Sequence, residues 1–260
     1  MGTIHPTAIV EDGAKIGENV SIGAYSYISK DVTIGDNTTI GSHTLIEGIT
    51  TIGKENQIFS HAVVGSIPQD LKYSGERVEL VIGDNNKIRE FTLINPGTIG
   101  GGSVTKIGNG NLLMGYVHIA HDVIVGNRCI LANGATLAGH VELGDGVVIG
   151  GLTPIHQFVK IGDLAMVAGA SALSQDVPPY CLVEGNRAKL RGLNLTGLRR
   201  AIDKDNINEL KRAYKEMFIK VELMQKRADE LKDSENIYIK NMANFVLNSK
   251  RGIAIPRSKD

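Results

Sequence analysis

Aliphatic residues recur at every sixth position over most of this chain, and no other feature of the sequence limits the possible folds as strongly. The series runs from Ile4 to Val64, returns at Ile82, and continues from Ile107 to Leu173. A period of six matches neither the turn of an α-helix nor the alternation of a lone strand. It matches a short strand followed by a tight corner, repeated around a prism. The sequence therefore predicts an all-β solenoid.

Glycine supports this interpretation, because the 260 residues include 31 glycines and many of them directly follow the repeating aliphatic residue. The corners of such a coil need positive φ angles, which glycine and asparagine adopt readily. In folds with this repeat, three six-residue units close one coil of about 18 residues, so inward side chains stack at that spacing. We expect a left-handed parallel β-helix over residues 1–188.

The repeat is interrupted at residues 65–81 and 95–106, where turn-forming and charged residues replace it. We interpret both segments as loops that leave the coil. Loops on rigid scaffolds often carry function, but insertions without function have the same composition. Residues 189–260 lack the repeat, and we expect them to form an α-helical C-terminal domain that covers the open end of the solenoid. Asp205 is expected to cap its first long helix, and a second amphipathic stretch spans residues 237–247.

The composition excludes several classes of protein. Hydrophobic residues make up 42% of the chain and charged residues 22%, which is typical of a globular protein rather than a disordered or transmembrane one. Basic and acidic residues number 28 each, so binding of nucleic acid through bulk positive charge is not expected. Cys129 and Cys181 lack the spacing of a disulfide framework or zinc module. With no export pattern at the N-terminus, we expect a cytoplasmic protein without a transmembrane segment.

A cluster of histidines is the strongest candidate for a functional site. Its members are His118, His121, His140 and His156. Given the spacing of the coils, all four should lie along one edge of the prism, within roughly 10 Å. In the same register His121, Gly139 and Gln157 should lie one above another. Clustered groups that titrate near neutral pH suit general base chemistry, and Asp122 would orient the imidazole beside it.

Metal binding is the main alternative use of these histidines. Three imidazoles at a subunit interface could hold zinc, but the spacing offers no cysteine or acidic partner in matched register. We therefore predict no metal site. No serine or cysteine nucleophile is evident, since Cys129 lies among aliphatic residues. Direct attack by a hydroxyl group of the substrate is the more economical mechanism.

The motifs themselves resemble those of a known family, the bacterial acyl-carrier-protein–UDP-N-acetylglucosamine O-acyltransferases. They are the run GNLLMGYVHIAHDVIVGNRCILANGATLAGHVELGD, followed by GGLTPIHQFVKIG, QDVPPY, EGNRA and RGLNLTGLRR. The resemblance covers essentially the whole chain. It implies transfer of a 3-hydroxyacyl group from acyl carrier protein to the 3-position of UDP-N-acetylglucosamine, the first step of lipid A biosynthesis. It also implies a homotrimer, and no cofactor beyond the phosphopantetheine of the carrier protein.

The resemblance further implies roles for individual residues. His121 would deprotonate the sugar hydroxyl, Asp122 would orient His121, and the Gly139 amide would stabilise the oxyanion. The expected substrate-binding residues are Asp70, Lys72, His118, His140, His156, Gln157, Gly169, Asn194 and Arg200. In the family, Asp70 and Lys72 would meet the sugar or acyl portion and the last two the nucleotide end. A small residue at the position of Gly169 would admit a long acyl chain.

Three positions depart from the family pattern, and they bear on the acceptor. Asn95 stands where many relatives have a histidine, and Thr196 and Ala201 replace a glutamate and an arginine. An alternative acceptor is therefore a 3-amino analogue of the UDP-sugar, which would give an amide. A metal-dependent lyase and a non-catalytic binder on the same fold are the alternatives from other classes. Residues 187–227 carry 12 basic and 5 acidic residues, which suits an acidic carrier protein as partner.

Overall fold

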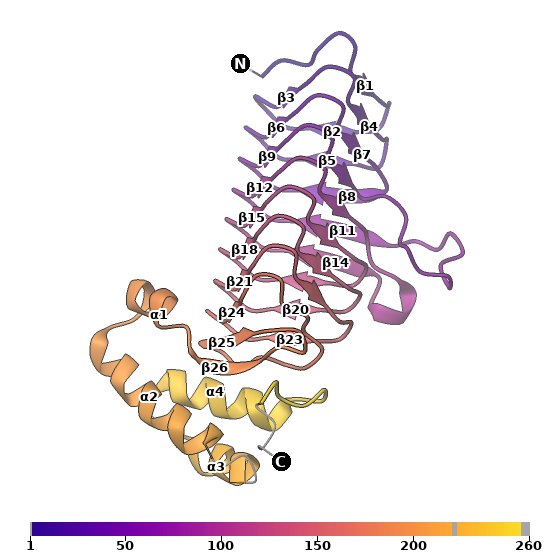
Figure 1. Cartoon of the computed structure of the whole chain (residues 1–260). Helices are drawn as coiled ribbons and strands as arrows, with labels where there is room; N and C mark the ends of the chain where they lie inside the picture. Colours follow the sequence, from indigo (N-terminus) through magenta and orange to yellow (C-terminus); the bar gives the residue numbers. More distant parts are fainter. Residues whose placement is uncertain (1, 220–222, 256–260) are drawn as a thin grey trace.

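The computed structural model of the chain describes residues 2–219 and 223–255. Stacked coils form a prism, and helices cover the end of it that contains the last coils (Figure 1). The coils make a left-handed parallel β-helix, so the predicted solenoid with a helical C-terminus is confirmed. Within the two described ranges, no helix is both long enough and apolar enough to span a membrane.

Three sheets form the faces of the prism, and their strands are parallel except at the last pair of the third sheet. The first sheet contains β1 (Ile9–Val10), β4 (Tyr27–Ile28), β7 (Leu45–Ile46), β10 (Val63–Val64), β13 (Leu93–Ile94), β16 (His118–Ile119), β19 (Thr136–Leu137) and β22 (Pro154–Ile155). The second contains β2 (Lys15–Ile16), β5 (Thr33–Ile34), β8 (Ile49–Ile52), β11 (Glu79–Ile82), β14 (Val104–Ile107), β17 (Ile124–Val125), β20 (Glu142–Leu143) and β23 (Lys160–Ile161). The third contains β3 (Ser21–Ile22), β6 (Thr39–Ile40), β9 (Gln57–Ile58), β12 (Lys87–Ile88), β15 (Leu112–Leu113), β18 (Ile130–Leu131), β21 (Val148–Ile149), β24 (Met166–Val167), β25 (Cys181–Glu184) and β26 (Lys189–Leu193).

The repeating aliphatic residues stack in register along the interior. Ile16 pairs with Ile34, and Ile34 with Ile52, in the regular step of 18 residues. The step becomes 30 residues and then 25 where the two loops leave the coils, but Ile52, Ile82 and Ile107 still pair in sequence. Most of these side chains are buried, so the stack removes apolar surface from water along the prism.

Both predicted loops are present, but each ends earlier than its predicted boundary. Strand β11 begins at Glu79 and strand β14 at Val104, inside the ranges 65–81 and 95–106. These strands pair with each other over four residues, and β11 pairs in the same way with β8. The longer pairing draws residues out of the loops and into the sheet. The second loop also contains one short 3-10 helix, η1 (Ile99–Gly101).

The C-terminal region begins with a strand rather than a helix. Residues 189–193 form β26, which pairs antiparallel with β25. The helices are α1 (Leu195–Ala201), α2 (Lys204–Phe218), α3 (Met224–Leu231) and α4 (Ile237–Asn248). The prediction that Asp205 caps the first long helix is wrong, because the Asp203 carboxylate accepts the N–H groups of Asp205 and Asn206. Asp205 instead lies in the first turn, where negative charge also stabilises a helix.

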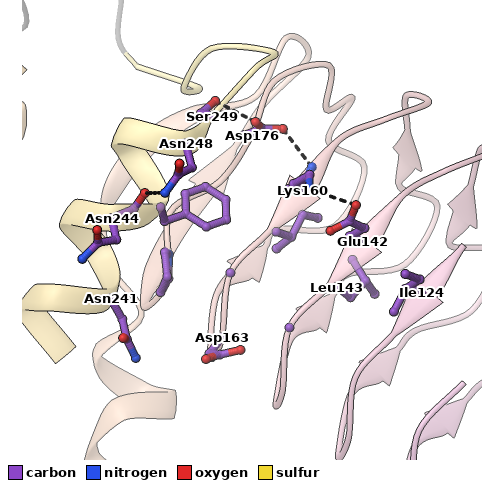
Figure 2. A pocket seen from close by; sticks show the side chains of 15 residues that line it. Ile124, Glu142, Leu143, Lys160, Asp163, Asp176, Asn241, Asn244, Asn248 and Ser249 are labelled. Carbon is purple, nitrogen blue, oxygen red and sulfur yellow. Dashed lines mark hydrogen bonds and ion pairs between the residues drawn. The ribbon is translucent and has the colours of Figure 1, made fainter. Parts of the chain in front are cut away.

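Asp176 fastens the helical region to the solenoid. Its buried carboxylate accepts hydrogen bonds from the backbone N–H of Lys160 (2.8 Å) and from Ser249 Oγ (2.7 Å). Figure 2 shows how this line of contacts continues from Lys160 to Glu142, whose ion pair measures 2.9 Å. Beside it, a cavity of about 520 Å³ separates α4 from strands β20 and β23 (Figure 2).

Candidate active site

His121 and Asp122 occupy the corner that follows strand β16. Asp122 has a φ of 60°, and its side chain turns into the protein, where only 1% of it is exposed. The Nδ1 atom of His121 lies 2.8 Å from Oδ2 of Asp122. An ionised carboxylate can only accept hydrogen bonds, so the proton of the neutral imidazole is on Nδ1. This leaves the Nε2 lone pair of His121 free to accept a proton.

The carboxylate of Asp122 has a full set of partners. Its Oδ1 accepts the backbone N–H of Thr98 (2.8 Å), and its Oδ2 accepts the Thr98 hydroxyl (2.6 Å) as well as His121. The backbone N–H of Asp122 donates to Thr105 Oγ1 at 2.8 Å. Sequence reasoning did not single out Thr98, because no sequence motif distinguishes this threonine from other threonines in loops.

Gly139 lies beneath His121, one coil further along the prism, as the predicted column requires. A Cβ atom at position 139 would lie 2.5 Å from Cε1 and 2.7 Å from Nε2 of His121, so only glycine leaves room for the imidazole. The N–H group of Gly139 has no hydrogen-bond acceptor within the described part of the chain. The backbone of Gly139, whose N–H is unpaired among the described residues, therefore lies against the imidazole that would act as base.

His140 completes the cluster on the other side of Asp122. Its ring meets that of His121 edge to face, with centroids 5.1 Å apart, and stacks on Phe158 at 4.4 Å. Its Nδ1 lies 3.9 Å from Asp122 Oδ2. Burial lowers the pKa of His140 below its ordinary value, which keeps this imidazole neutral at physiological pH.

His118 lies in strand β16, on the same edge of the prism as the cluster. Burial lowers the pKa of His118 too, and its Nδ1 atom is buried without a hydrogen-bond partner among the described residues. His156 and Gln157 are exposed and follow strand β22, two coils beyond His121. The Nδ1 atom of His156 lies 3.3 Å from Nη2 of Arg251, a residue that sequence reasoning did not consider.

The predicted residues of the first loop face the cluster across a cavity. Asp70 and Lys72 line a volume of about 410 Å³ together with His140 and Phe158, and part of the second loop, 98–100, lines it as well. The backbone N–H of Lys72 donates to Asp70 Oδ1 at 3.0 Å. The 520 Å³ cavity of Figure 2 contains none of the predicted site residues, so we assign the candidate active site to the smaller cavity.

The remaining predicted residues lie away from this cavity. Gly169 is exposed at a corner, and a Cβ there would meet only the backbone of Gly151, at 3.4 Å or more. Asn194 is buried and caps helix α1, accepting the N–H of Gly197 and donating to the carbonyl of Leu164. Arg200 is exposed on α1. A single chain therefore does not bring these three residues to His121 and Asp122, which we call the dyad.

Asn95 is buried where the second loop leaves strand β13. Its amide nitrogen donates to the carbonyl groups of Ser66 (2.9 Å) and Ile67 (3.0 Å), which ties the two loops together. Its Oδ1 is buried without a partner among the described residues. Because Ile94 pairs with Ile119, Asn95 is in register with Ala120, the residue before His121.

One metal-binding geometry is present in the cluster. Ligand atoms of His121, Asp122 and His140 lie within 4.8 Å of one another. An acidic partner is therefore within reach, contrary to the argument from spacing. However, the Asp122 oxygens already accept three hydrogen bonds, from Thr98 and His121, and a metal ion would have to displace part of them.

Comparisons with known proteins agree with the motifs. Residues 176–254 match the family model described as UDP-N-acetylglucosamine O-acyltransferase, domain 2, and residues 13–48 and 105–139 match the bacterial transferase hexapeptide model. The acyl-(acyl-carrier-protein)–UDP-N-acetylglucosamine O-acyltransferase of Sulfurovum sp. (strain NBC37-1) is 67% identical over 99% of both chains. That of Aliarcobacter butzleri (strain RM4018) is 64% identical over 99% of this chain and 100% of its own.

The chain belongs to the acyl-(acyl-carrier-protein)–UDP-N-acetylglucosamine O-acyltransferase family. Solved structures of this O-acyltransferase family superpose over nearly the whole chain. The UDP-N-acetylglucosamine acyltransferase of Campylobacter jejuni is 52% identical to this chain, with a TM-score of 0.94. The superposition includes 98% of this chain and 100% of the Campylobacter chain. The protein from Acinetobacter baumannii is 43% identical, with a TM-score of 0.93, and its superposition includes 96% of this chain and 99% of the Acinetobacter chain. The family resemblance carried by the motifs is therefore confirmed.

Proposed function

We propose that this chain transfers a 3-hydroxyacyl group from acyl carrier protein to the 3-hydroxyl of UDP-N-acetylglucosamine, the first step of lipid A biosynthesis, with His121 as general base. One observation carries the proposal. The Nε2 atom of His121 lies within 2.7 Å of the point where a Cβ of residue 139 would be, so it is close to the backbone of Gly139. The N–H of Gly139 has no acceptor among the described residues, and the Nδ1 atom of His121 is held by the buried Asp122. Acyl transfer needs this pairing of a base with an oxyanion donor.

The proposed reaction proceeds by direct attack. His121 Nε2 accepts the proton of the sugar hydroxyl as its oxygen forms a bond to the thioester carbon. The Gly139 N–H stabilises the negative charge on the carbonyl oxygen of the tetrahedral intermediate. The C–S bond then breaks, and the imidazolium of His121 returns the proton to the pantetheine sulfur. Asp122 stabilises that imidazolium and remains ionised throughout.

The cysteines support direct attack rather than an acyl-enzyme. Both Cys129 and Cys181 are fully buried. Burial raises the pKa of the Cys129 thiol to about 11 and raises that of Cys181 further, so neither forms the thiolate that covalent catalysis requires. Neither cysteine is therefore suited to form a covalent acyl-enzyme intermediate, which supports transfer straight from the donor to the sugar.

The surface supports the proposed partners. Exposed basic side chains on α1 and α2, including Arg199, Arg200 and Arg212, suit an acidic carrier protein. For the homotrimer, the support is a column of exposed rings at one corner of the prism. It consists of Tyr25, His43, His61, Phe91 and Tyr116, with neighbouring centroids 4.9 to 5.2 Å apart. Such a contiguous exposed patch suits contact with other subunits. Buried, unpaired cysteines fit a cytoplasmic location.

Asn95 favours a second acceptor, the 3-amino analogue of the UDP-sugar. Its buried Oδ1 can only accept hydrogen bonds, and it has no partner among the described residues. An amino group offers one more hydrogen to such an acceptor than a hydroxyl does. The base, the oxyanion donor and the acyl donor stay the same in this version, and the product is an amide.

The test is a transfer assay, followed by mass spectrometry, with 3-hydroxyacyl carrier proteins and both UDP-sugars offered side by side. We expect O-acylated product from the wild-type protein and a loss of at least about 100-fold in His121→Ala. His5→Ala, which changes an exposed histidine near the N-terminus, is the matched control. No product from either sugar would reject the proposed function. Activity of His121→Ala within tenfold of the wild type would reject only the base.

A further inference from the structure

The second loop, residues 95–103, closes over the carboxylate of Asp122. Thr98 supplies two of the hydrogen bonds to this carboxylate, one from its backbone N–H to Oδ1 and one from its hydroxyl to Oδ2. Both Thr98 and Asp122 are buried. We propose that Thr98 is a positioning residue for acyl transfer, which orients Asp122 and through it the imidazole of His121. This inference rests on the proposed function.

Thr98 is also the residue on which the loop itself closes. Its carbonyl oxygen accepts the N–H groups of Gly101 (3.0 Å) and Ser103 (2.8 Å). The same residue therefore fixes the tip of the loop and the carboxylate behind it. Ile99 and Gly100 follow directly and line the 410 Å³ cavity, so the wall that meets the substrate and the support of the dyad belong to one short segment.

Gly101 gives independent evidence that the loop is fitted to Asp122. A Cβ atom built at position 101 would overlap the carboxyl group of Asp122, so the backbone of Gly101 lies directly against that group. Only 1% of the Asp122 side chain is exposed, and Thr98 and Gly101 are among the residues that lie against it. A buried carboxylate without water depends on protein donors, which makes each hydrogen bond from Thr98 valuable.

The two histidines around Asp122 explain why its orientation matters. Oδ2 lies 2.8 Å from Nδ1 of His121 but also 3.9 Å from Nδ1 of His140. The Thr98 hydroxyl meets the same oxygen and holds it on the His121 side. Without that hydroxyl, the carboxylate can rotate toward His140. His121 then loses the acceptor that fixes its tautomer and that stabilises its protonated form.

The experiment compares steady-state transfer by Thr98→Val, Thr98→Ser and the wild-type protein. Valine keeps the shape of threonine and removes the hydroxyl, whereas serine retains the hydroxyl. We expect Thr98→Val to lower kcat by about 10- to 100-fold, the range found for groups that orient a functional imidazole. The KM for each substrate should stay within about twofold. Thr98→Ser should restore kcat to within about threefold of the wild type.

Thr38→Val is the matched control for general effects on the solenoid. Thr38 is buried like Thr98, and its hydroxyl donates to the carbonyl of Gly53 and accepts the N–H of Asn56, in coils far from the dyad. This variant should lose stability in urea without a fall in kcat per folded molecule. A second variant, Gly101→Ala, should reproduce the kcat defect of Thr98→Val, because its Cβ displaces Asp122.

Two results would overturn the inference. One is a kcat for Thr98→Val within twofold of the wild type. The other is an equal fall in kcat for Thr98→Val and Thr38→Val, which would make the role of Thr98 merely structural. Both results require active wild-type protein and an inactive His121→Ala. If the wild-type protein itself forms no product, the proposed function fails and not the positioning role.

Discussion

The imidazole of His121 occupies the space that a side chain at position 139 would fill. The two residues are far enough apart in sequence to lie on successive coils, and the stacking of the coils brings one above the other. Gly139 is thus needed for a steric reason as well as for its N–H group. The step between two coils therefore sets the separation of the proposed base and the proposed oxyanion donor.

Gly139→Ala should therefore disable the site without unfolding the protein. The new methyl group would push the imidazole away and cover the N–H group, so we expect kcat to fall by at least about 100-fold, as for loss of an oxyanion donor. Gly115→Ala is the control, because its Cβ would meet only the flexible Asn133 side chain and one carbonyl oxygen, at 3.2 Å or more. Wild-type kcat in Gly139→Ala would contradict the assigned role.

Metal ions should inhibit transfer rather than support it. A zinc ion bound by His121, Asp122 and His140 would occupy the base and break its contact with Asp122. We expect full activity after exhaustive chelation, and inhibition by added zinc that chelator reverses. Metal content by mass spectrometry and transfer rates measure both effects. Loss of transfer on chelation, restored by zinc, would instead show that the reaction needs a metal ion at this cluster.

The stability of the protein should fall on mild acidification. His118 has an ordinary pKa of about 6.5 in the unfolded chain, and burial lowers its pKa in the folded protein. Between these two values the unfolded state binds more protons, so the free energy of unfolding decreases as the pH falls below about 6.5. The decrease ends once folded His118 is itself protonated.

His118→Gln should make this part of the pH dependence shallower. Urea denaturation between about pH 5 and 8 measures it, with the wild-type protein as reference. His140 has a pKa lowered by the same cause, so part of the dependence should persist in the single variant and diminish again in the double variant with His140→Gln. An unchanged slope in both variants would show that other groups dominate.

Asp176 should be a major determinant of how firmly the helical region is attached. Asp176→Ala leaves the Lys160 N–H and the Ser249 hydroxyl, both partly buried, without their acceptor. Each hydrogen bond to a charged group contributes about 1.5 to 3 kcal/mol, so we expect the free energy of unfolding to fall by about 3 kcal/mol. Ser249→Ala removes only one of them and should have a smaller effect. Equal free energies of unfolding in urea for the wild type and both variants would refute this role.

The sequence predicted the solenoid because its period is carried by the residues themselves. Ile16, Ile34 and Ile52 stack as their spacing indicates, and the same arithmetic places His121 over Gly139. The sequence pattern did not predict where the strands begin, because pairing between β11 and β14 extends both strands into the predicted loops. Likewise Asp203, rather than Asp205, had the extended backbone that a cap requires.

The contacts between loops and coils were beyond prediction from spacing. Thr98 and Phe158 reach the dyad and His140 only through the three-dimensional path of the chain, and neither belongs to the histidine pattern. Asn194 shows the opposite case. Its motif is recognisable in the sequence, but within one chain its side chain caps a helix far from the dyad.

The aliphatic stack continues without a break through the two coils from which the loops depart, because Ile52, Ile82 and Ile107 stay paired despite the longer steps between them. The scaffold and the first loop can therefore change independently during evolution. Substitutions, insertions or deletions in residues 65–78 can alter one wall of the 410 Å³ cavity while the aliphatic stack stays intact. Residues 95–103 are more constrained, because Thr98 and Gly101 lie against Asp122. A lineage can therefore reshape this first-loop wall of the cavity without rebuilding the prism.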